Sequence, residues 1–188
     1  MEIIKTEIDG PLIIEPRVFG DSRGYFFESF NEREFRSKTG LDIRFVQDNE
    51  SRSHYGVLRG LHFQNPPYTQ SKLVRVVEGK VVDVAVDIRT GSPTYGKYVM
   101  VELTGENHRQ FFVPKGFAHG FVVLSETAVF QYKCDEFYNP QSEGALIWND
   151  PDINVKWPVP EDKIELSEKD RHHPALKDFT SPFTYEEN

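Results

Sequence analysis

The sequence predicts an all-β fold, a small jelly-roll barrel with a few short helices. Its 188 residues include 15 Phe and 8 Tyr together with many Val, and these residue types favour strands over helices. The 12 Pro and 13 Gly stand mostly between apolar runs, as they do in barrels and sandwiches with many turns. The length suits one sizeable core, and we find no linker or internal repeat, so residues 1–188 are expected to form a single domain.

The N-terminal region is expected to contain two short strands, over residues 2–8 and 12–19, separated by an Asp-Gly-Pro turn. A first strand without a partner nearby in the sequence is a candidate for pairing across a dimer. Residues 19–28 are interpreted as a turn that enters another strand. Within them, Arg23 and Glu28 taken alone are best interpreted as ordinary surface charges.

A short helix is expected over residues 32–38. Asn31 can cap its N-terminus, and Glu34 occupies the reciprocal position of a capping box. Gly40 follows the last helical residue and provides the stop.

The rest of the chain is dominated by β-rich runs bounded by turn residues. From residue 149 onward it becomes Pro-rich and irregular, with a short helix expected to start at residues 167–170. Strands are expected over residues 43–53, 57–63, 72–78, 81–88, 97–103, 109–113, 121–124, 128–133 and 145–148.

Two of these strands carry polar residues at unusual places. In the run 81–88, Val and Ile occupy alternate positions, so Asp83 faces the barrel interior if the valine row packs outward against another sheet. Residues 47–49, Gln-Asp-Asn, are polar where a strand should be apolar. They form either a turn or bulge, or a row of amide groups that faces a ligand.

The stretch from Gly56 to Gly79 organises the chain. It places His62 in one strand and Lys72 in the next, and a buried Lys is costly without a partner or a function. This spacing resembles the first motif of the cupins, which are double-stranded β-helix barrels. Metal-binding cupins have a second His where this chain has Gln64, and a Glu at the position of Lys72; a protonated Lys has no lone pair for a metal. The barrel is thus favoured and a metal site is argued against.

The second cupin motif is expected at residues 114–119, Pro-Lys-Gly-Phe-Ala-His. It keeps its histidine, His119. The Asn that usually follows four residues later is replaced by Val123, which again speaks against a metal.

Charge and cysteine content exclude several classes of protein. A net charge of −8 argues against a nucleic-acid binder. The single cysteine, Cys134, rules out an intramolecular disulfide and fits a reducing cytoplasm. No apolar run approaches transmembrane length, and the N-terminus lacks a basic region followed by an apolar one. We therefore expect a cytoplasmic protein with no membrane partner.

Several motifs in one order resemble a single family, the dTDP-4-dehydrorhamnose 3,5-epimerases. The resemblance covers nearly the whole chain, and the motifs together are far more specific than any one of them. Cys134, Phe137 and the pair His172-His173 depart from the family pattern at positions to which it gives no chemical role. The motifs are Arg-Gly-Leu-His-Phe-Gln at 59–64, the run 72–79, Pro-x-Gly-Phe-Ala-His-Gly-Phe at 114–121, the segment 132–138, Trp-Asn-Asp-Pro at 148–151, and Leu-Ser-Glu-Lys-Asp at 166–170.

The resemblance implies a double epimerisation of dTDP-4-dehydro-6-deoxy-D-glucose without a cofactor or metal. It gives His62 the role of base and Asp170 that of its orienting partner. Tyr132 would donate a proton on the other face of the sugar, and Lys72 would stabilise the enolate. Tyr138 matches the aromatic residue that stacks on thymine. Further positions match contacts to the nucleotide-sugar: Arg23, Glu28, Gln47, Asp48, Asn49, Arg59, His119, Glu143 and Lys169.

This chemistry suits these residue types. The C3 and C5 protons are both α to the C4 ketone, so removing either one puts negative charge on O4. Histidine titrates near neutrality and suits the base, and a carboxylate on its other nitrogen fixes the tautomer. A cation aimed at O4 can replace a metal ion. Arginine suits the diphosphate because it can bind two oxygens at once.

One detail conflicts with strict strand alternation. Arg59 and His62 have opposite parity on a regular strand, yet both are expected in the site. Either Gly60 introduces a bulge, or Arg59 serves a different part of the site.

Three alternatives remain at this point. A 3-only or 5-only epimerase, or a ketoisomerase, could use the same base on a related dTDP-deoxysugar. A metal cupin is disfavoured by Gln64 and Lys72. A non-catalytic sugar-nucleotide binder would need no base.

The resemblance also implies a homodimer in which N-terminal strands are exchanged. Small jelly rolls leave sheet edges that need to be covered, which is consistent with such a dimer.

Overall fold

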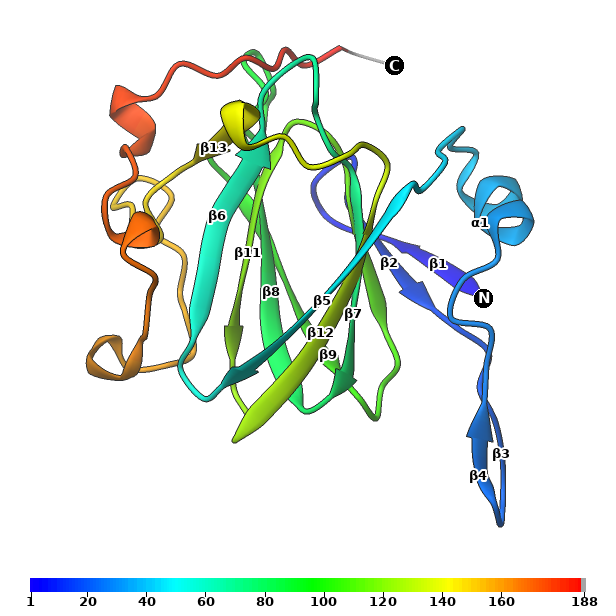
Figure 1. The fold of residues 1–188 in the computed structure, drawn as a ribbon. Coiled ribbons are helices and arrows are strands. Elements are labelled where there is room, and N and C mark those ends of the chain that lie inside the picture. Colours follow the sequence, from blue (N-terminus) through cyan, green and yellow to red (C-terminus); the bar gives the residue numbers. More distant parts are fainter. Residues whose placement is uncertain (187–188) are drawn as a thin grey trace.

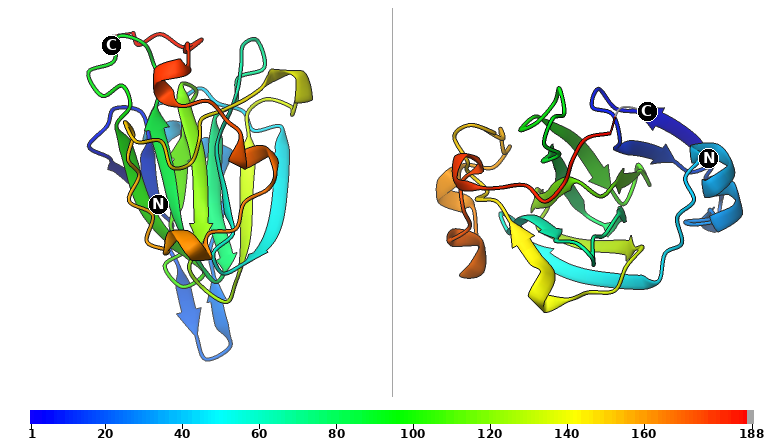
Figure 2. Two further views of the ribbon diagram at one scale, coloured as in Figure 1. Left: turned by 90° about the vertical axis from the view of Figure 1, so that its left-hand side faces the viewer. Right: turned by 90° about the horizontal axis from the view of Figure 1, so that it is seen from above.

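The computed structural model describes residues 1–186 and confirms the all-β class, with two curved antiparallel sheets that face each other as a barrel (Figures 1 and 2). Every pair of neighbouring strands is antiparallel within the part described. One sheet has the order β1 (Glu2–Lys5), β2 (Leu12–Glu15), β10 (Gln110–Val113), β7 (Lys72–Glu78), β12 (Thr127–Cys134) and β5 (Gln47–His54). The other has the order β13 (Glu143–Ala145), β6 (Leu58–Gln64), β11 (Phe117–Val123), β8 (Lys80–Asp87) and β9 (Tyr98–Thr104).

A separate two-stranded hairpin, β3 (Phe19–Asp21) and β4 (Gly24–Phe26), projects away from the barrel (Figure 1). The expected strand over 12–19 therefore ends at Glu15, and Phe19 belongs to this hairpin. The first strand likewise ends at Lys5 rather than residue 8. The register pairs Phe19 with Phe26 and Asp21 with Gly24, so the turn is as short as a hairpin permits.

The barrel interior is packed by alternate residues of both sheets. Val81 and Ala85 of β8 join Val74 of β7 and Phe130 of β12 in one buried cluster. Asp83 lies in the same inward row and is fully buried, as the alternation predicted. The interior is therefore apolar except where Asp83 and its neighbours introduce charge.

The opposite row of β8 faces outward and is buried too. Val82, Val84, Val86 and Ile88 pack with apolar residues of the C-terminal segment, residues 146–183. The expectation that this row packs against another sheet is wrong, because the covering layer is irregular chain, including the two tryptophans. The four short 3₁₀ helices η1 (Pro140–Ser142), η2 (Glu161–Lys163), η3 (Lys169–Arg171) and η4 (Leu176–Asp178) lie in or just before this layer.

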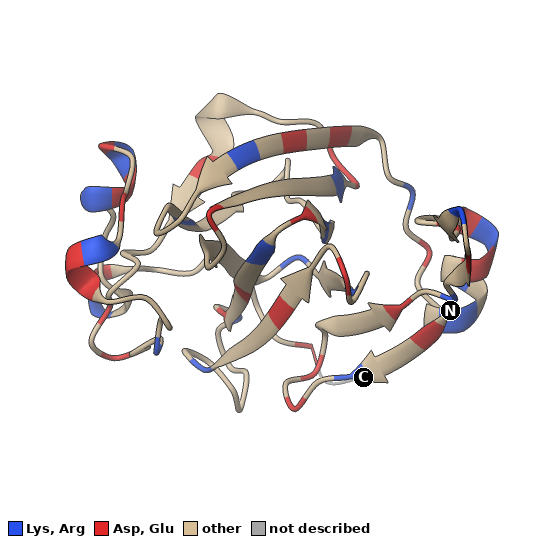
Figure 3. Ribbon diagram, turned by 90° about the horizontal axis from the view of Figure 1, so that it is seen from below, with Lys and Arg blue, Asp and Glu red and all other residues tan. Residues whose placement is uncertain are grey.

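The helix α1 (Glu32–Thr39) forms as predicted, one residue longer. The Asn31 side chain accepts a hydrogen bond from the Glu34 backbone N–H at 3.1 Å, and Gly40 ends the helix with a φ of 73°. The reciprocal half of the capping box does not form, because the Glu34 carboxylate accepts a hydrogen bond from the Met1 amine instead. Acidic and basic residues alternate over the exposed side of this helix (Figure 3).

The buried side of α1 covers the outer face of the six-stranded sheet. Phe35 packs with Ile14, Leu73 and Phe112, and its ring meets that of Phe112 edge-on at 5.8 Å. This contact anchors the N-terminal region to β2, β7 and β10.

A bulge in β6 resolves the conflict between Arg59 and His62. Arg59 pairs with Phe121 of β11, and His62 pairs with His119, so three steps along β6 match two along β11. The extra residue restores parity and turns both side chains toward the interior. Gly60 lies at the bulge with a φ of 145°, and a Cβ there would come within 2.6 Å of the Gly120 Cα.

The last strand lies two residues earlier than expected, over Glu143–Ala145 rather than residues 145–148. Glu143 and Gly144 pair with Gln64 and Phe63. A Cβ at Gly144 would fall 2.3 Å from the Phe63 ring, so the strand requires glycine at this point. The Leu146 backbone still exchanges hydrogen bonds with Leu61 of β6, at 2.9 and 3.2 Å, and the side chains of Leu146 and Trp148 join the outer apolar layer.

The strand expected over 43–53 begins at Gln47, and the polar residues 47–49 lie inside it rather than in a turn. Within residues 1–186 there is no helix long and apolar enough to cross a membrane.

Candidate active site

One large cavity, of about 1270 Å³, opens between the two sheets and is bordered by the C-terminal segment. It collects most of the side chains that the sequence singled out. The lining includes Asn49, Arg59, His62, Lys72, His119, Tyr132, Tyr138, Glu143, Lys169 and Asp170.

His62 and Asp170 form a hydrogen-bonded pair in this cavity. His62 comes from β6 and Asp170 from η3, and His62 Nε2 lies 2.5 Å from Asp170 Oδ1. Burial alone would raise the pKa of Asp170, but hydrogen bonds from His62 and from His173 hold it below its ordinary value. The carboxylate is therefore charged and orients the ring, and with Nε2 donating to it, Nδ1 is left with a free lone pair.

Lys72 supplies a partly buried amine from the facing sheet. Burial lowers the pKa of Lys72, while Cys134 and Asp83 act against that shift. Its Nζ lines the cavity without a hydrogen-bond partner among residues 1–186 and lies 5.8 Å from the centre of the Tyr132 ring. An amine held in this way is available to a ligand oxygen.

Tyr132 stands on β12, next to β7, with its ring packed against the interior cluster. Burial raises the pKa of Tyr132, so the phenol stays protonated at neutral pH. The hydroxyl makes no hydrogen bond to any other residue that the structure describes. His62 and Tyr132 thus approach the cavity from opposite sheets, His62 with a free lone pair and Tyr132 with a protonated hydroxyl.

His119 and Asp83 form a second buried pair. His119 Nε2 lies 2.8 Å and 3.0 Å from the two carboxylate oxygens of Asp83. Burial raises the pKa of Asp83, and the nearby His119 and Lys72 counteract it. Asp83 therefore links two cavity residues, although the resemblance assigned it no role. Its position in the middle of an apolar strand was the signal that could have identified it.

A network of charged and aromatic groups borders the cavity. The Tyr138 hydroxyl donates to Glu143 at 2.8 Å, and Lys169 Nζ donates to the other oxygen of Glu143 at 3.0 Å. The bond to Glu143 raises the pKa of Tyr138, and the bond from Tyr138 lowers that of Glu143. The Tyr138 ring is half exposed, which leaves its face free for stacking.

Four predicted site residues lie outside the cavity of this chain. Arg23 is on the projecting hairpin, 88% exposed and paired with Asp21, and Glu28 follows the hairpin. Asp48 points to the outer face of β5 and bonds Lys133. Gln47 faces inward but bonds Asn49 and the Tyr138 backbone beside the cavity.

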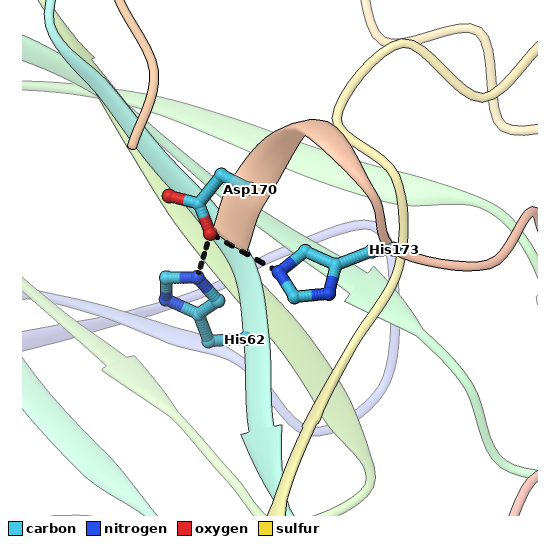
Figure 4. Close-up of side chains that lie close together, drawn as sticks. All are labelled: His62, Asp170 and His173. Atoms are coloured by element: carbon cyan, nitrogen blue, oxygen red, sulfur yellow. Dashed lines mark hydrogen bonds and ion pairs between the residues drawn. The ribbon is translucent and has the colours of Figure 1, made fainter. Parts of the chain in front are cut away.

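His173 lies in the cavity and was not among the predicted site residues. It donates from Nε2 to Asp170 at 3.2 Å (Figure 4). A single histidine in an irregular segment has no periodicity, so the sequence carried no signal for it. His62, Asp170 and His173 are also the one group of three possible metal ligands among residues 1–186, their ligand atoms lying within 4.8 Å of one another. Both histidines hydrogen-bond the carboxylate directly, which explains the grouping without an ion.

The family model for dTDP-4-dehydrorhamnose 3,5-epimerase matches residues 5–178. The chain belongs to this family. A relative of that name from Shigella flexneri is 56% identical over 170 residues, covering 90% of this chain and 93% of the relative. The family is one of isomerases, and its cupin-like barrel agrees with the fold described here.

Solved structures of the family extend the comparison. The epimerase RmlC from Legionella pneumophila, in complex with dTDP-4-keto-L-rhamnose, has a TM-score of 0.95 and 50% identity, covering 99% of both chains. ChmJ, a 3′-monoepimerase from Streptomyces bikiniensis in complex with dTDP-quinovose, has a TM-score of 0.85 and 35% identity, covering 92% of this chain and 87% of ChmJ. The same barrel thus occurs with different epimerisation outcomes.

Proposed function

We propose that this chain converts dTDP-4-dehydro-6-deoxy-D-glucose to dTDP-4-dehydro-L-rhamnose by inverting C3 and C5, a step of dTDP-L-rhamnose biosynthesis. The observation that carries the proposal is the His62–Asp170 pair, which faces Lys72 and Tyr132 across one cavity. A binding protein needs no such base, whereas proton abstraction beside a ketone does.

In each epimerisation, His62 Nδ1 takes the proton from the carbon α to the C4 ketone. The electrons of the broken C–H bond form a carbon–carbon double bond and move the carbonyl pair onto O4. Lys72 stabilises the resulting oxyanion, and Asp170 stabilises the imidazolium. Tyr132 then gives a proton to the same carbon from the opposite face and becomes a phenolate, which is reprotonated as His62 releases its proton to solvent. Two such rounds invert two centres and leave the molecular formula unchanged.

The nucleotide end of the substrate is proposed to bind at the cavity border. Tyr138 offers a half-exposed ring for the thymine, with Glu143 and Lys169 fixing its orientation. Arg59 provides a guanidinium for the diphosphate, since its hydrogen bonds to the Ser53 hydroxyl, at 3.3 and 3.4 Å, are long and leave other donors free. Asn49 and His119 provide further polar contacts within the cavity.

We also propose that two copies form a homodimer in which the β3–β4 hairpin of each reaches the other. Phe19, Tyr25 and Phe26 on this hairpin are 51%, 60% and 67% exposed. Three large aromatic side chains on a two-stranded ribbon are an unfavourable surface in water unless covered. An occupied interface would bring Arg23 and Glu28 to the partner's cavity, which accounts for their distance from the cavity of their own chain.

A second candidate is inversion at one centre only. It is supported by ChmJ, which is named a 3′-monoepimerase and has a closely similar fold. The same base and enolate stabiliser serve both reactions, and the outcome depends on which carbon the sugar presents to His62 and Tyr132.

The deciding experiment is NMR of the product formed from the 4-keto sugar nucleotide in deuterated water. We expect deuterium and inverted configuration at both C3 and C5. Deuterium at one carbon alone would identify a monoepimerase instead.

His62→Ala should lose activity by a factor of about 100 to 10,000 while it still binds dTDP. Loss of dTDP affinity in a folded His62→Ala protein would make His62 a binding or structural residue.

The absence of a cofactor or metal requirement is tested in the same assay. Metal analysis of the purified protein should find no bound ion. Incubation with a chelator should leave turnover unchanged, because Lys72 performs the role of the ion. Activity that falls with chelation and returns with an added metal would contradict the proposed mechanism.

A further inference from the structure

The catalytic pair has a third member. Asp170 Oδ1 accepts a hydrogen bond from His62 Nε2 at 2.5 Å and another from His173 Nε2 at 3.2 Å, so both imidazoles converge on one carboxylate oxygen (Figure 4). The Asp170 side chain is only 5% exposed and that of His173 is 22% exposed. We propose that His173 is a positioning residue of the epimerase, which fixes the Asp170 carboxylate and limits how strongly that carboxylate stabilises protonated His62. This inference rests on the proposed role of His62 as base.

The segment that carries His173 is anchored on both sides. The backbone N–H of Asp170 donates to the Ser167 hydroxyl at 3.2 Å. Beyond His173, the carbonyl of Pro174 accepts a hydrogen bond from the Ile147 N–H at 2.9 Å, and the Leu176 N–H donates to Asp150 at 2.6 Å. The His173 ring also stands edge-on to the His62 ring, with 6.0 Å between centroids. Its position is thus defined by the backbone as well as by Asp170.

The consequence for catalysis follows from sharing one acceptor atom. A second donor on the same carboxylate oxygen stabilises the charged carboxylate and so makes it a weaker acceptor for the first donor. The bond from His173 therefore weakens the hold of Asp170 on protonated His62. A positive charge on His173 would also repel one on His62, because both imidazoles contact the same carboxylate oxygen.

Other charged groups also face His62, and they are the same in the variants proposed below. They are Arg59 on β6, Lys72 on β7, His119 on β11, Tyr132 on β12, Glu143 on β13, and Lys169 on η3. Glu143 and Lys169 are bonded to each other, and His119 is bonded to Asp83. A change that appears only when His173 is replaced therefore reports on the shared carboxylate.

The chain provides a matched control in the neighbouring residue. His172 is 70% exposed and pairs with Glu168 at the surface, so it touches neither Asp170 nor the cavity. Replacing His172 with Phe changes the same residue type one position away and leaves the carboxylate untouched.

The experiment compares His173→Phe, His173→Gln and His172→Phe. His173→Phe keeps a ring but removes the donor, so kcat should fall about tenfold while KM changes by less than about twofold, since the lost bond is to a charged group away from the substrate. The acid limb of the kcat/KM pH profile should move to higher pH, because protonated His62 is then better stabilised. His173→Gln, whose amide can donate, should recover most of both effects, and His172→Phe should behave as wild type.

A second measurement does not depend on turnover. Imidazole ¹⁵N spectra of the wild-type enzyme should give coupled titration curves for His62 and His173, and the His62 curve should move to higher pH in His173→Phe. This readout separates the two proposals. Full activity of His62→Ala would refute the role of His62 as base, whereas the coupling between His62 and His173 could still be measured in the wild-type enzyme. Independent wild-type titrations, or a His173→Phe enzyme with the wild-type pH profile, would overturn the positioning role. Failure of His173→Gln to recover either effect would reduce His173 to a packing residue.

Discussion

The proposed proton transfer depends on individual side chains whose surroundings suit them to different roles. His62 is paired with a charged carboxylate and keeps a free nitrogen, whereas the pKa of Tyr132 is raised by burial and its hydroxyl stays protonated. Lys72 contributes an amine with no hydrogen-bond partner among residues 1–186. Three groups on two facing sheets thus have the chemistry that the proposed roles of base, acid and oxyanion stabiliser require.

Tyr132→Phe should separate proton exchange from inversion. The variant keeps His62 as base and Lys72 as enolate stabiliser, but it lacks the donor on the other face. Reprotonation must then come from His62 itself or from water. We expect deuterium to enter the sugar with the starting configuration largely retained, as measured by NMR in deuterated water.

Substrate affinity of Tyr132→Phe should change little, because one neutral hydrogen bond contributes only about 0.5 to 1.5 kcal/mol. Binding of dTDP provides the control for folding. Inversion of both centres at a rate near that of the wild type would mean that another group or water is the acid.

At the level of single residues, the sequence predicted the proposed reactive groups, which share one cavity, but it did not predict all the residues that support them. His62, Lys72, Tyr132 and Asp170 stand in motifs and meet in one cavity. His173 could not be predicted, because its role depends on where an irregular segment folds back, which no periodicity encodes. Asp48, by contrast, was predicted in the site but lies outside the cavity. It shares a polar motif with Gln47 and Asn49, but strand alternation directs its side chain to the outer face, where its carboxylate accepts a hydrogen bond from Lys133.

Among the elements, β6 has the largest effect on the site. Its bulge turns both Arg59 and His62 inward, and the sequence could offer this only as one of two explanations. A bulge is defined by register against the neighbouring strand, here β11, and that register depends on tertiary pairing. The valine row of β8 illustrates the same point. Its alternation was predicted, but the irregular segment that covers it was not.

Gly60→Ala should therefore destabilise the protein and impair catalysis together. The φ of 145° is unfavourable for any side chain, and the new Cβ would approach the Gly120 backbone within 2.6 Å. Strain and overpacking of this kind cost about 2 kcal/mol or more, which chemical denaturation can measure. Because the bulge aligns Arg59 with His62, kcat/KM of the folded fraction should fall as well.

Gly91→Ala is the matched control for Gly60→Ala. Gly91 also has a positive φ, of 86°, but a Cβ there meets nothing within 4 Å. The Gly91→Ala variant should lose stability through backbone strain alone and keep the wild-type kcat/KM. Equal kinetic effects in the two variants would show that the bulge has no special bearing on the site.

At the scale of the whole molecule, one chain brings together the proposed reactive groups but not all the predicted substrate contacts. The barrel holds the reactive groups and the border residues Tyr138, Glu143 and Lys169. Arg23 and Glu28 lie on or just after a hairpin that projects away from the barrel (Figure 1), and neither lines this cavity. The sequence alone could not locate the hairpin, because short polar and aromatic strands give little periodic signal.

The proposed dimer makes a specific prediction for mixed subunits. If Arg23 completes the partner's cavity, Arg23→Ala and His62→Ala damage the site through different chains. Each variant alone should be impaired, Arg23→Ala by about tenfold or more through loss of a charged hydrogen bond. In a mixed dimer, one of the two sites combines the intact His62 of the Arg23→Ala chain with the intact Arg23 of the His62→Ala chain. Random reassortment in a two-fold dimer should then restore about a quarter of wild-type activity.

The control for this experiment mixes His62→Ala with Asp170→Asn, whose altered residues belong to one cavity of one chain. That mixture should restore nothing, because every site lacks one of the two groups. Light scattering at micromolar concentration should give the mass of two chains for each protein. A monomeric mass would refute the dimer, and a dimer without restored activity would place Arg23 outside the partner's site. Restoration in the first mixture but not in the second would require the hairpin of one subunit to act in the cavity of the other.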